Sequence, residues 1–383
     1  MGSVERRRHD GTTSWTARRR DPNGRQRKKA FARRVDAERF LSTITADVVR
    51  GTYVDPHDPT TFREYAEAWR ESQLHRPTTR AHVETNLRRH AYPRFGDRRL
   101  AAVRPSEIQA WVTSMTHILS PATVQVVHGI VAVIFKAALR DRLVSTSPCE
   151  GTRLAKKVPV EVRPLSTATV QALVDAVPKR YRALLVLADG TGMRQGECFG
   201  LADTRLDLDE HTLRVEQQLI LLPRHPPFLG PPKTPVSHRT IPLPDVVVTA
   251  LREHLAYSPV HHHDRLVFTD DDGRGIRRTT FSREIWRPAV TAAGAPHGTG
   301  FHDLRHYYAS LLIRHGESIK TVQRRLGHAT AAETLDTYAH LWPDSDDRVR
   351  DAVDSALAPR PRTTNATTTR PAARPRPQLG PSP

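Results

Sequence analysis

Cysteine is scarce in this sequence, since Cys149 and Cys198 are the only two in 383 residues. Two thiols cannot form the disulfide framework of a small secreted protein, and this usage fits a reducing compartment. Long hydrophobic runs are also missing, because the longest apolar stretches, such as residues 130–135, fall far short of the ~20 residues that cross a bilayer. No apolar run follows the arginines near the N-terminus, so no secretory signal is predicted. We therefore expect a cytoplasmic protein without a membrane segment.

Acidic residues are in deficit relative to basic ones. The chain has 41 Asp and Glu against 59 Lys and Arg, which gives a formal net charge of +18. Such a balance favours a polyanionic partner, most often nucleic acid, because each neutralised phosphate releases condensed counterions. The alternative is a merely soluble basic protein whose arginine content reflects a GC-rich genome. The excess is concentrated at the front, where residues 1–40 hold 13 basic and 5 acidic residues.

The basic front of the chain has the pattern of a small folded module. Residues 13–20 and 25–31 are predicted to be strands, and the Asp-Pro-Asn-Gly sequence at residues 21–24 supplies the turn between them. A helix is predicted over residues 35–50, with one apolar face and a glycine as its stop. We interpret residues 1–57 as a basic module that contacts DNA. A solvated charged surface without a ligand is the alternative.

Residues 58–150 are predicted to be mostly helical. Thr61 and Glu64 have the spacing of a capping box at the start of the first helix. Two later helices each begin at a proline, Pro105 and Pro121, and carry apolar residues at helical spacing. We interpret the aromatic residues of this region as its core.

The remainder of the chain divides into a linker, a mixed domain and a tail. Residues 151–164 lack periodicity and are predicted to be an interdomain linker, whereas residues 165–357 mix helices with short strands. Residues 358–383 contain no aromatic or acidic residue, so we expect them to be disordered. The predicted fold class is mixed and predominantly α-helical, with a β-hairpin-plus-helix module, a helical domain and an α+β domain. In the last of these we expect helices at 168–177, 182–188, 245–255, 281–293, 303–315, 319–326 and 332–340, and strands at 212–221, 240–243 and 265–269.

Four separate groups of polar residues in the last predicted domain have side chains suited to phosphate chemistry. At positions i and i+3, His302 and Arg305 would share one helical face. Taken singly, each residue has an ordinary structural explanation, such as an ion pair between Arg194 and Glu197. In chain order the groups are a glycine-punctuated turn that carries Arg194 and leads into a short helix, a proline-rich hairpin tip that carries Lys233, the sequence His302-Asp303-Leu304-Arg305-His306, and Leu326-Gly327-His328 followed by Tyr338.

Together and in this order, these residues resemble the catalytic pattern of the tyrosine recombinases, the phage-type integrases that cut and rejoin DNA. The resemblance covers residues 165–345 through motifs and the rest of the chain through its domain order. It implies that residues 1–57 bind arm sites, that residues 58–150 bind the core site, and that residues 165–357 form the catalytic domain with a C-terminal helix. Flanking residues that agree with the pattern are Gly196-Glu197, Arg239-Thr240-Ile241-Pro242 and Leu335-Asp336-Thr337.

The resemblance implies a role for each residue, and the roles suit the side chains. Arg194 and Arg305 would clamp the non-bridging oxygens of a phosphodiester as these gain charge. Tyr338 would attack phosphorus and leave a 3′-phosphotyrosine and a free 5′-hydroxyl. Since the reference pKa of a phenol is near ~10, the attack needs a base, for which the resemblance implies His302. Lys233 would protonate the departing 5′ oxygen.

The remaining residues of the pattern have supporting roles. By the resemblance, His328 would donate a hydrogen bond to a non-bridging oxygen. We interpret Glu197 as orienting Arg194 by a charge-assisted hydrogen bond, and His306 as a packing or supporting residue of its helix. No metal, cofactor or ATP is implied, because the cations are side chains and the covalent link stores the bond energy.

Two alternatives concern the helix that carries the histidines. Tyr307 and Tyr308 are rival nucleophiles on reach alone, but we interpret them as packing residues because they lie within that helix. The spacing of His302 and His306 also resembles that of a zinc hydrolase helix. Asp303 stands where that chemistry needs glutamate, however, and no third ligand follows.

The resemblance implies double-stranded DNA as the partner, with core and arm attachment sites. Exchange of strands between two duplexes needs four active sites, which implies a homotetramer on DNA and a monomer in free solution. A directionality factor or a host DNA-bending protein would be a further partner. Two other functions remain open, namely a DNA-binding regulator that has lost catalysis and a relaxing enzyme like the type IB topoisomerases, which share the same chemistry.

Overall fold

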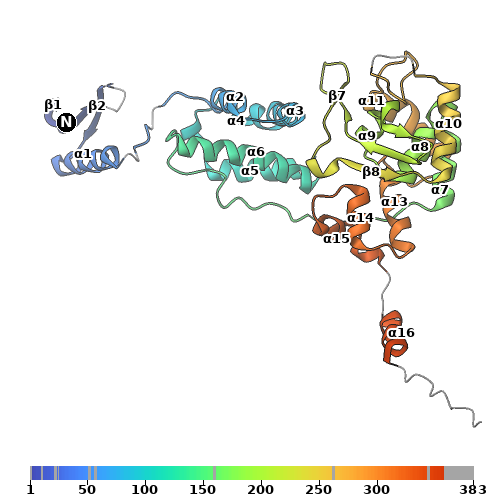
Figure 1. Ribbon diagram of the computed structural model, residues 1–383. Helices are drawn as coiled ribbons and strands as arrows, with labels where there is room; N and C mark the ends of the chain where they lie inside the picture. Colours follow the sequence, from blue (N-terminus) through green and yellow to red (C-terminus); the bar gives the residue numbers. More distant parts are fainter. Residues whose placement is uncertain are drawn as a thin grey trace, which may run out of the picture.

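The computed structural model describes residues 2–9, 12–20, 24, 26–50, 53–55, 58–157, 161–260, 264–342 and 346–357. A small N-terminal module is followed by a helical domain, then by a larger C-terminal domain of helices and short strands, and last by a separate helix (Figure 1). The tail predicted to be disordered, residues 358–383, lies outside the described residues.

The N-terminal module is a three-stranded antiparallel sheet with one helix packed on it. Strand order is β1-β2-β3, and α1 contacts all three strands. The rings of Phe31 and Phe40, 5.2 Å apart between centroids, join the last strand to the helix. The elements are β1 (Ser3–His9), β2 (Thr12–Arg20), β3 (Gln26–Phe31) and α1 (Arg34–Val49).

This module has one strand more than the sequence predicts. β1 pairs with β2 along its whole length, from Ser3 opposite Arg18 onward. The segment has one aliphatic residue, Val4, and three consecutive arginines, so it lacks the apolar alternation by which a strand is recognised. Residues 21–23 of the predicted turn lie outside the described residues.

The helical domain is built around buried aromatic rings. Phe62 lies 5.4 Å from Phe135 between ring centroids, and Phe95 lies 5.2 Å from Trp111. The predicted capping box is confirmed, because Thr61 and Glu64 exchange both hydrogen bonds at the start of α2. The elements are α2 (Phe62–Ser72), α3 (Pro77–Asn86), α4 (Tyr92–Phe95), a 3₁₀ turn (Leu100–Ala102), α5 (Pro105–Thr116) and α6 (Pro121–Arg140).

Among the described residues, α6 alone is long and apolar enough to span a membrane when only length and composition are considered. A helix at the centre of a globular core meets the same criterion. Ile134 and Phe135 of α6 are fully buried within the helical domain, as are further residues on the same face. We therefore interpret α6 as the central helix of this core.

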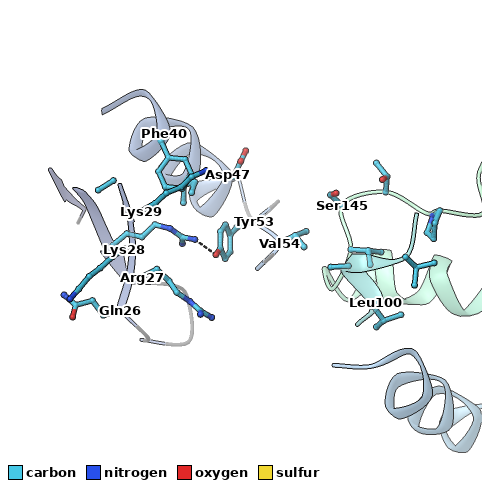
Figure 2. Close-up of a pocket in the computed structure, with 18 of the residues that line it drawn as sticks. Gln26, Arg27, Lys28, Lys29, Phe40, Asp47, Tyr53, Val54, Leu100 and Ser145 are labelled. Carbon is cyan, nitrogen blue, oxygen red and sulfur yellow. Dashed lines mark hydrogen bonds between the residues drawn. The ribbon is translucent and has the colours of Figure 1, made fainter. Parts of the chain in front are cut away.

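A cavity of about 1030 Å³ lies between the N-terminal module and the helical domain (Figure 2). The segment that joins the two parts is held against the sheet, because Arg19 donates a hydrogen bond to the Tyr53 hydroxyl and Arg27 pairs with Asp55, both at 2.5 Å. Basic side chains of β2 and β3 thus line one wall. The N-terminal module, which forms one wall of this cavity, lies on the other side of the helical domain from the C-terminal domain that carries the recombinase pattern (Figure 1).

The C-terminal domain packs helices around two small sheets. One sheet has the order β4-β5-β8, and β6 and β7 form a separate hairpin between its second and third strands. The elements are α7 (Thr167–Ala176), α8 (Lys179–Thr191), α9 (Gln195–Phe199), β4 (Leu206–Asp207), β5 (Thr212–Val215), β6 (Gln218–Ile220), β7 (Phe228–Gly230), β8 (Arg239–Pro242), α10 (Asp245–Tyr257), α11 (Arg278–Phe281), α12 (Arg287–Ala292), α13 (Asp303–Arg314), α14 (Ile319–Leu326), α15 (Ala331–Tyr338) and α16 (Asp346–Leu357), with 3₁₀ turns at Asp203–Arg205, Pro235–Ser237 and Ala339–Leu341.

Two of the predicted strands differ from the structure. The strand predicted over residues 212–221 is divided into β5 and β6, which pair with different partners. The strand predicted over residues 265–269 is wrong, because only isolated bridges occur there, at Leu266 and Thr269. Arg265 has a positive φ of 50°, which an extended strand does not accommodate.

Two helices contain a π-helical turn shortly before a proline. Leu87–Ala91 precedes Pro93, and Ser282–Trp286 precedes Pro288. Proline lacks an N–H group and its ring crowds the carbonyl four residues earlier, so a wider turn at these places relieves the conflict. This explains why the helix predicted over residues 281–293 appears as α11, a π turn and α12.

Candidate active site

The turn between α8 and α9 fixes both arginines of the predicted site. Gly192 ends α8 with a left-handed φ of 64°, and a Cβ atom there would lie 2.4 Å from the ring of Tyr308. Glycine is therefore required on both conformational and steric grounds. Its carbonyl accepts a hydrogen bond from Arg305 Nη1 at 2.7 Å, while Arg194, two residues later, is the N-cap of α9.

Glu197 is a buried carboxylate shared by two arginines. It accepts hydrogen bonds from Arg194 Nη1 at 2.9 Å and from Arg239 Nη2 at 2.8 Å, and its side chain is only 1% exposed. Burial acts to raise the pKa of Glu197, but Arg239 and Arg194 outweigh it and hold the pKa below its ordinary value. Arg194 also donates to Ser237 Oγ at 3.2 Å and to the Gly327 carbonyl at 3.1 Å. The contact expected of Glu197 is thus present.

Arg239, which the sequence singles out only as a flanking residue, is part of the same network. Its guanidinium donates to the carbonyls of Ser237 and Arg325, each at 2.9 Å, and so ties β8 to the end of α14. One signal could have found it. Arg239 shares a strand face with Ile241, which is fully buried, and a buried arginine on such a face needs acidic or carbonyl partners.

Arg305 is almost completely buried at 2% exposure. Besides the bond to Gly192, its Nη2 donates to the Leu326 carbonyl at 2.7 Å. Burial and the charge of Arg194 lower the pKa of Arg305 to about 9, so the guanidinium stays charged at neutral pH. These two bonds to described residues leave further N–H groups of this five-donor side chain for a ligand.

Tyr338, at the end of α15, lies within this cluster. Its side chain is 1% exposed, and its hydroxyl lies 2.8 Å from Nδ1 of His306 on α13. The ring is stacked with that of His328 at a centroid distance of 6.4 Å. Burial raises the pKa of Tyr338 to about 12, although the charge of Arg305 opposes the shift. The phenol is therefore protonated at rest and needs a proton acceptor.

His302 occupies the N-cap position of α13 and remains exposed at the surface of the site. Its ring stands edge-on to that of His306, with centroids 4.8 Å apart. Partial withdrawal from water, followed by the charges of His306 and Arg305, lowers the pKa of His302 to about 4, so the ring is neutral at pH 7. It lines a cavity of about 1190 Å³ together with Arg194, Arg278 and Arg287.

His328 follows the left-handed Gly327, which ends α14 at a φ of 65°. Its Nδ1 lies 2.9 Å from the hydroxyl of Thr334, and its side chain is buried. Burial, followed by the charge of Arg305, lowers the pKa of His328 to about 4. The neutral ring is thus held in one orientation beside Tyr338.

Lys233 is the one residue of the pattern whose side chain the structure does not bring into the cluster. It is exposed in the segment between β7 and β8, and its ammonium group makes no hydrogen bond or ion pair with the described residues. The segment itself is anchored near the site. The Lys233 carbonyl accepts a hydrogen bond from Arg76 of the helical domain, and the next residue, Thr234, contacts Ser237 at 2.9 Å between hydroxyls.

The zinc alternative finds no support in this geometry. Among the residues that the structure describes, no group of three or more His, Cys, Asp or Glu side chains is placed to hold a metal ion. His306 points its Nδ1 at Tyr338, and His302 meets it edge-on. Charged guanidiniums and neutral imidazoles around a tyrosine hydroxyl are instead suited to a phosphodiester.

Comparison with known families agrees with the geometry. Residues 163–344 match the model of the phage integrase family, and residues 62–155 match that of the phage integrase central domain. The chain belongs to the phage integrase family of tyrosine recombinases. Membership of this family makes the protein a DNA recombinase. The predicted fold class is confirmed by the solved structures that share the fold.

The chain is similar to several named integrases. It is 28% identical over 340 residues to the prophage phiRv2 integrase of Mycobacterium tuberculosis, across 85% of this chain and 88% of that protein. It is 24% identical to the integrase of Mycobacterium phage D29, across 78% of this chain and 82% of that one.

Solved structures share the fold at low identity. The integrase of the Tn1549 transposon, residues 82–397 in complex with a circular intermediate DNA, has a TM-score of 0.66 at 20% identity and covers 77% of this chain and 99% of its own. A lambda integrase dimer bound to a COC' core site has a TM-score of 0.59 at 18% identity, and the match covers 88% of this chain and 96% of that one.

Proposed function

We propose that this protein is a site-specific recombinase that integrates or excises a mobile element by cutting and rejoining DNA through Tyr338. The observation that carries the proposal is the position of the Tyr338 hydroxyl. It lies inside a cluster formed by α13, α14 and α15, 2.8 Å from Nδ1 of His306, and the tyrosine ring is stacked with that of His328. Family membership supports the reaction class, and the geometry supports the choice of nucleophile.

Cleavage proceeds by transesterification at one phosphodiester. Tyr338 Oη attacks phosphorus, the bond from phosphorus to the 5′ oxygen breaks, and a 3′-phosphotyrosine and a 5′-hydroxyl result. Arg194 and Arg305 each keep N–H groups that no acceptor among the described residues uses, and these bind the non-bridging oxygens as charge develops. Rejoining reverses the step, so neither ATP nor a metal ion takes part.

Lys233 and the histidines complete the proposed chemistry. The ammonium group of Lys233 protonates the 5′ oxygen, which is otherwise a poor leaving group. Because the Lys233 side chain is exposed and lies outside the cluster, this role requires the segment between β7 and β8 to close on the substrate. His328 and His302, both neutral at pH 7, each have one N–H group with which to meet a phosphate oxygen.

Assembly on two duplexes requires four copies of the chain. We propose a tetramer on DNA and a monomer in solution, with α16 docking on a neighbouring copy. α16 stands apart from the C-terminal domain (Figure 1), and its Val353 and Leu357 are exposed. A directionality factor or a host DNA-bending protein belongs to the same proposal, as does a cytoplasmic, nucleoid-associated location.

The function is tested by trapping the covalent intermediate. In a core-site duplex nicked just beyond the scissile phosphate, cleavage releases a short fragment that carries the new 5′-hydroxyl. Once this fragment dissociates, the protein cannot rejoin the strand. We expect a protein–DNA adduct on denaturing gels in the presence of EDTA and without ATP, and recombined plasmids with intact substrates. Binding without an adduct would instead indicate a DNA-binding regulator, and relaxed but unrecombined plasmids would indicate a topoisomerase.

Deletion of residues 1–57 tests the assignment of the N-terminal module to arm sites. The three strands carry nine Lys and Arg residues, so the module supplies phosphate contacts. We expect its loss to weaken binding to arm-site DNA and to flatten the salt dependence of binding by about 0.9 in log–log slope for each phosphate contact removed. Cleavage of an isolated core site is the control and should persist. Unchanged arm-site affinity would contradict the assignment.

A further inference from the structure

His306 and Tyr338 form the only direct contact that the structure gives for the tyrosine hydroxyl among the described residues. His306 lies one turn after His302 on α13, and its Nδ1 is 2.8 Å from Tyr338 Oη. The two rings meet at 65° with centroids 5.6 Å apart, while His302 stands edge-on against the same imidazole. The imidazole of His306 is therefore fixed between the two side chains, with one nitrogen aimed at the nucleophile.

We propose that His306 is a catalytic residue, the group that accepts the proton of Tyr338 when that hydroxyl attacks phosphorus. This inference rests on the proposed function and adds a residue that the six-residue pattern does not contain. In the step, the bond between Tyr338 Oη and phosphorus forms and the bond to the 5′ oxygen breaks. The phenolic proton passes to Nδ1 of His306, and Lys233 gives a proton to the 5′ oxygen. Rejoining returns both protons.

The charge state of His306 suits an acceptor. Burial lowers the pKa of His306, Asp303 acts to raise it, and Arg305 lowers it further, with the net shift downward. The ring is therefore neutral at pH 7. A neutral imidazole with its hydrogen on Nε2 presents a lone pair at Nδ1, so the phenol donates and the histidine accepts. This is the geometry that general-base catalysis requires, within hydrogen-bond reach of the proton that is transferred.

His302 is less well placed for the same task. Its ring is exposed and lines the cavity of about 1190 Å³ that Arg194 also lines, whereas Tyr338 is not among the residues of that wall. Between His302 and the tyrosine lies the ring of His306. His302 thus faces the space where the DNA backbone would bind, and its N–H group suits a phosphate oxygen rather than the phenol.

The test uses the full-length protein and measures single-turnover adduct formation on the nicked core-site duplex. His306→Asn keeps a hydrogen-bond acceptor near the position of Nδ1 but cannot take a proton. We expect it to slow adduct formation by 10²- to 10⁴-fold, the usual range for general acid–base catalysis, while DNA binding stays within twofold of wild type. His315→Asn, an exposed position at the C-terminal end of the same helix, is the matched control and should cleave at the wild-type rate.

A more acidic nucleophile separates base catalysis from a merely structural role. With 3,5-difluorotyrosine at position 338, the proton is lost more readily, so the rate of His306→Asn should recover at least tenfold. The rate of Lys233→Ala should not recover in this way. A substrate with sulfur at the bridging 5′ position, which leaves without protonation, should instead rescue Lys233→Ala and leave His306→Asn slow.

Each outcome is decisive. Wild-type rates in His306→Asn would overturn the assignment, and so would a slow variant that fluorinated tyrosine fails to rescue. Both results would leave the recombinase function intact, since the wild-type adduct would still form. Absence of an adduct with the wild-type protein would overturn the recombinase function and the role of His306 together.

Discussion

Tyr338→Phe is expected to abolish the covalent protein–DNA adduct while DNA binding survives. The substitution removes one oxygen atom from a side chain that is 1% exposed, so the ring and its stacking on His328 remain. Without the hydroxyl there is no nucleophile, and the loss of cleavage should be complete rather than partial. Adduct formation is measured on the nicked duplex, and affinity on the same duplex by gel shift.

The neighbouring tyrosines provide the matched controls for this experiment. Tyr307 donates a hydrogen bond to the Thr167 hydroxyl at 3.1 Å, and Tyr308 packs against Gly192. These contacts agree with the interpretation of both tyrosines as packing residues. Tyr307→Phe and Tyr308→Phe should therefore still form the adduct. An adduct that persists in Tyr338→Phe and disappears in one of these variants would move the nucleophile to α13.

Much of the fold could be predicted because its signals are local. The capping box at Thr61, the helix starts at Pro105 and Pro121, and the helix over Ile319–Leu326 all follow from short-range patterns, and the structure confirms them. β1 was missed although its partner β2 follows directly, because its run of arginines lacks apolar alternation. The bridge at Leu266 pairs with Ala202, a distant residue that nothing in the local sequence reveals, and a full strand was therefore wrongly predicted there.

For the site, the sequence indicated which residues take part but not most of the contacts that they make. The resemblance to the tyrosine recombinases, carried by motifs in chain order, singled out Arg194, Arg305 and Tyr338. Apart from the contact between Arg194 and Glu197, which are close in sequence, the contacts of these side chains could not be predicted, because the partners are far apart along the chain. The hydrogen bond between His306 and Tyr338 spans 32 residues, and that between Arg194 and Gly327 spans 133. The exposure of the Lys233 side chain likewise follows from the fold and not from the motif.

Glu197→Ala is expected to destabilise the C-terminal domain by about 3–5 kcal/mol, the usual cost of removing one partner of a buried ion pair. The carboxylate is 1% exposed and neutralises Arg194 and Arg239, the latter only 5% exposed. Its loss leaves two like charges close together with too few acceptors, and it also removes the acceptor of the backbone N–H of Arg194 at the N-cap of α9. Calorimetry of the full-length protein measures the effect as a lower unfolding temperature for this domain.

The design of that measurement follows from the separate hydrophobic cores. The core of the helical domain and that of the C-terminal domain share no residues, so the helical domain provides an internal reference whose transition should not move. Glu253→Ala, at an exposed position on α10, is the control and should change stability by less than ~0.5 kcal/mol. If Glu197→Ala unfolded at the wild-type temperature, the carboxylate would not hold the arginines.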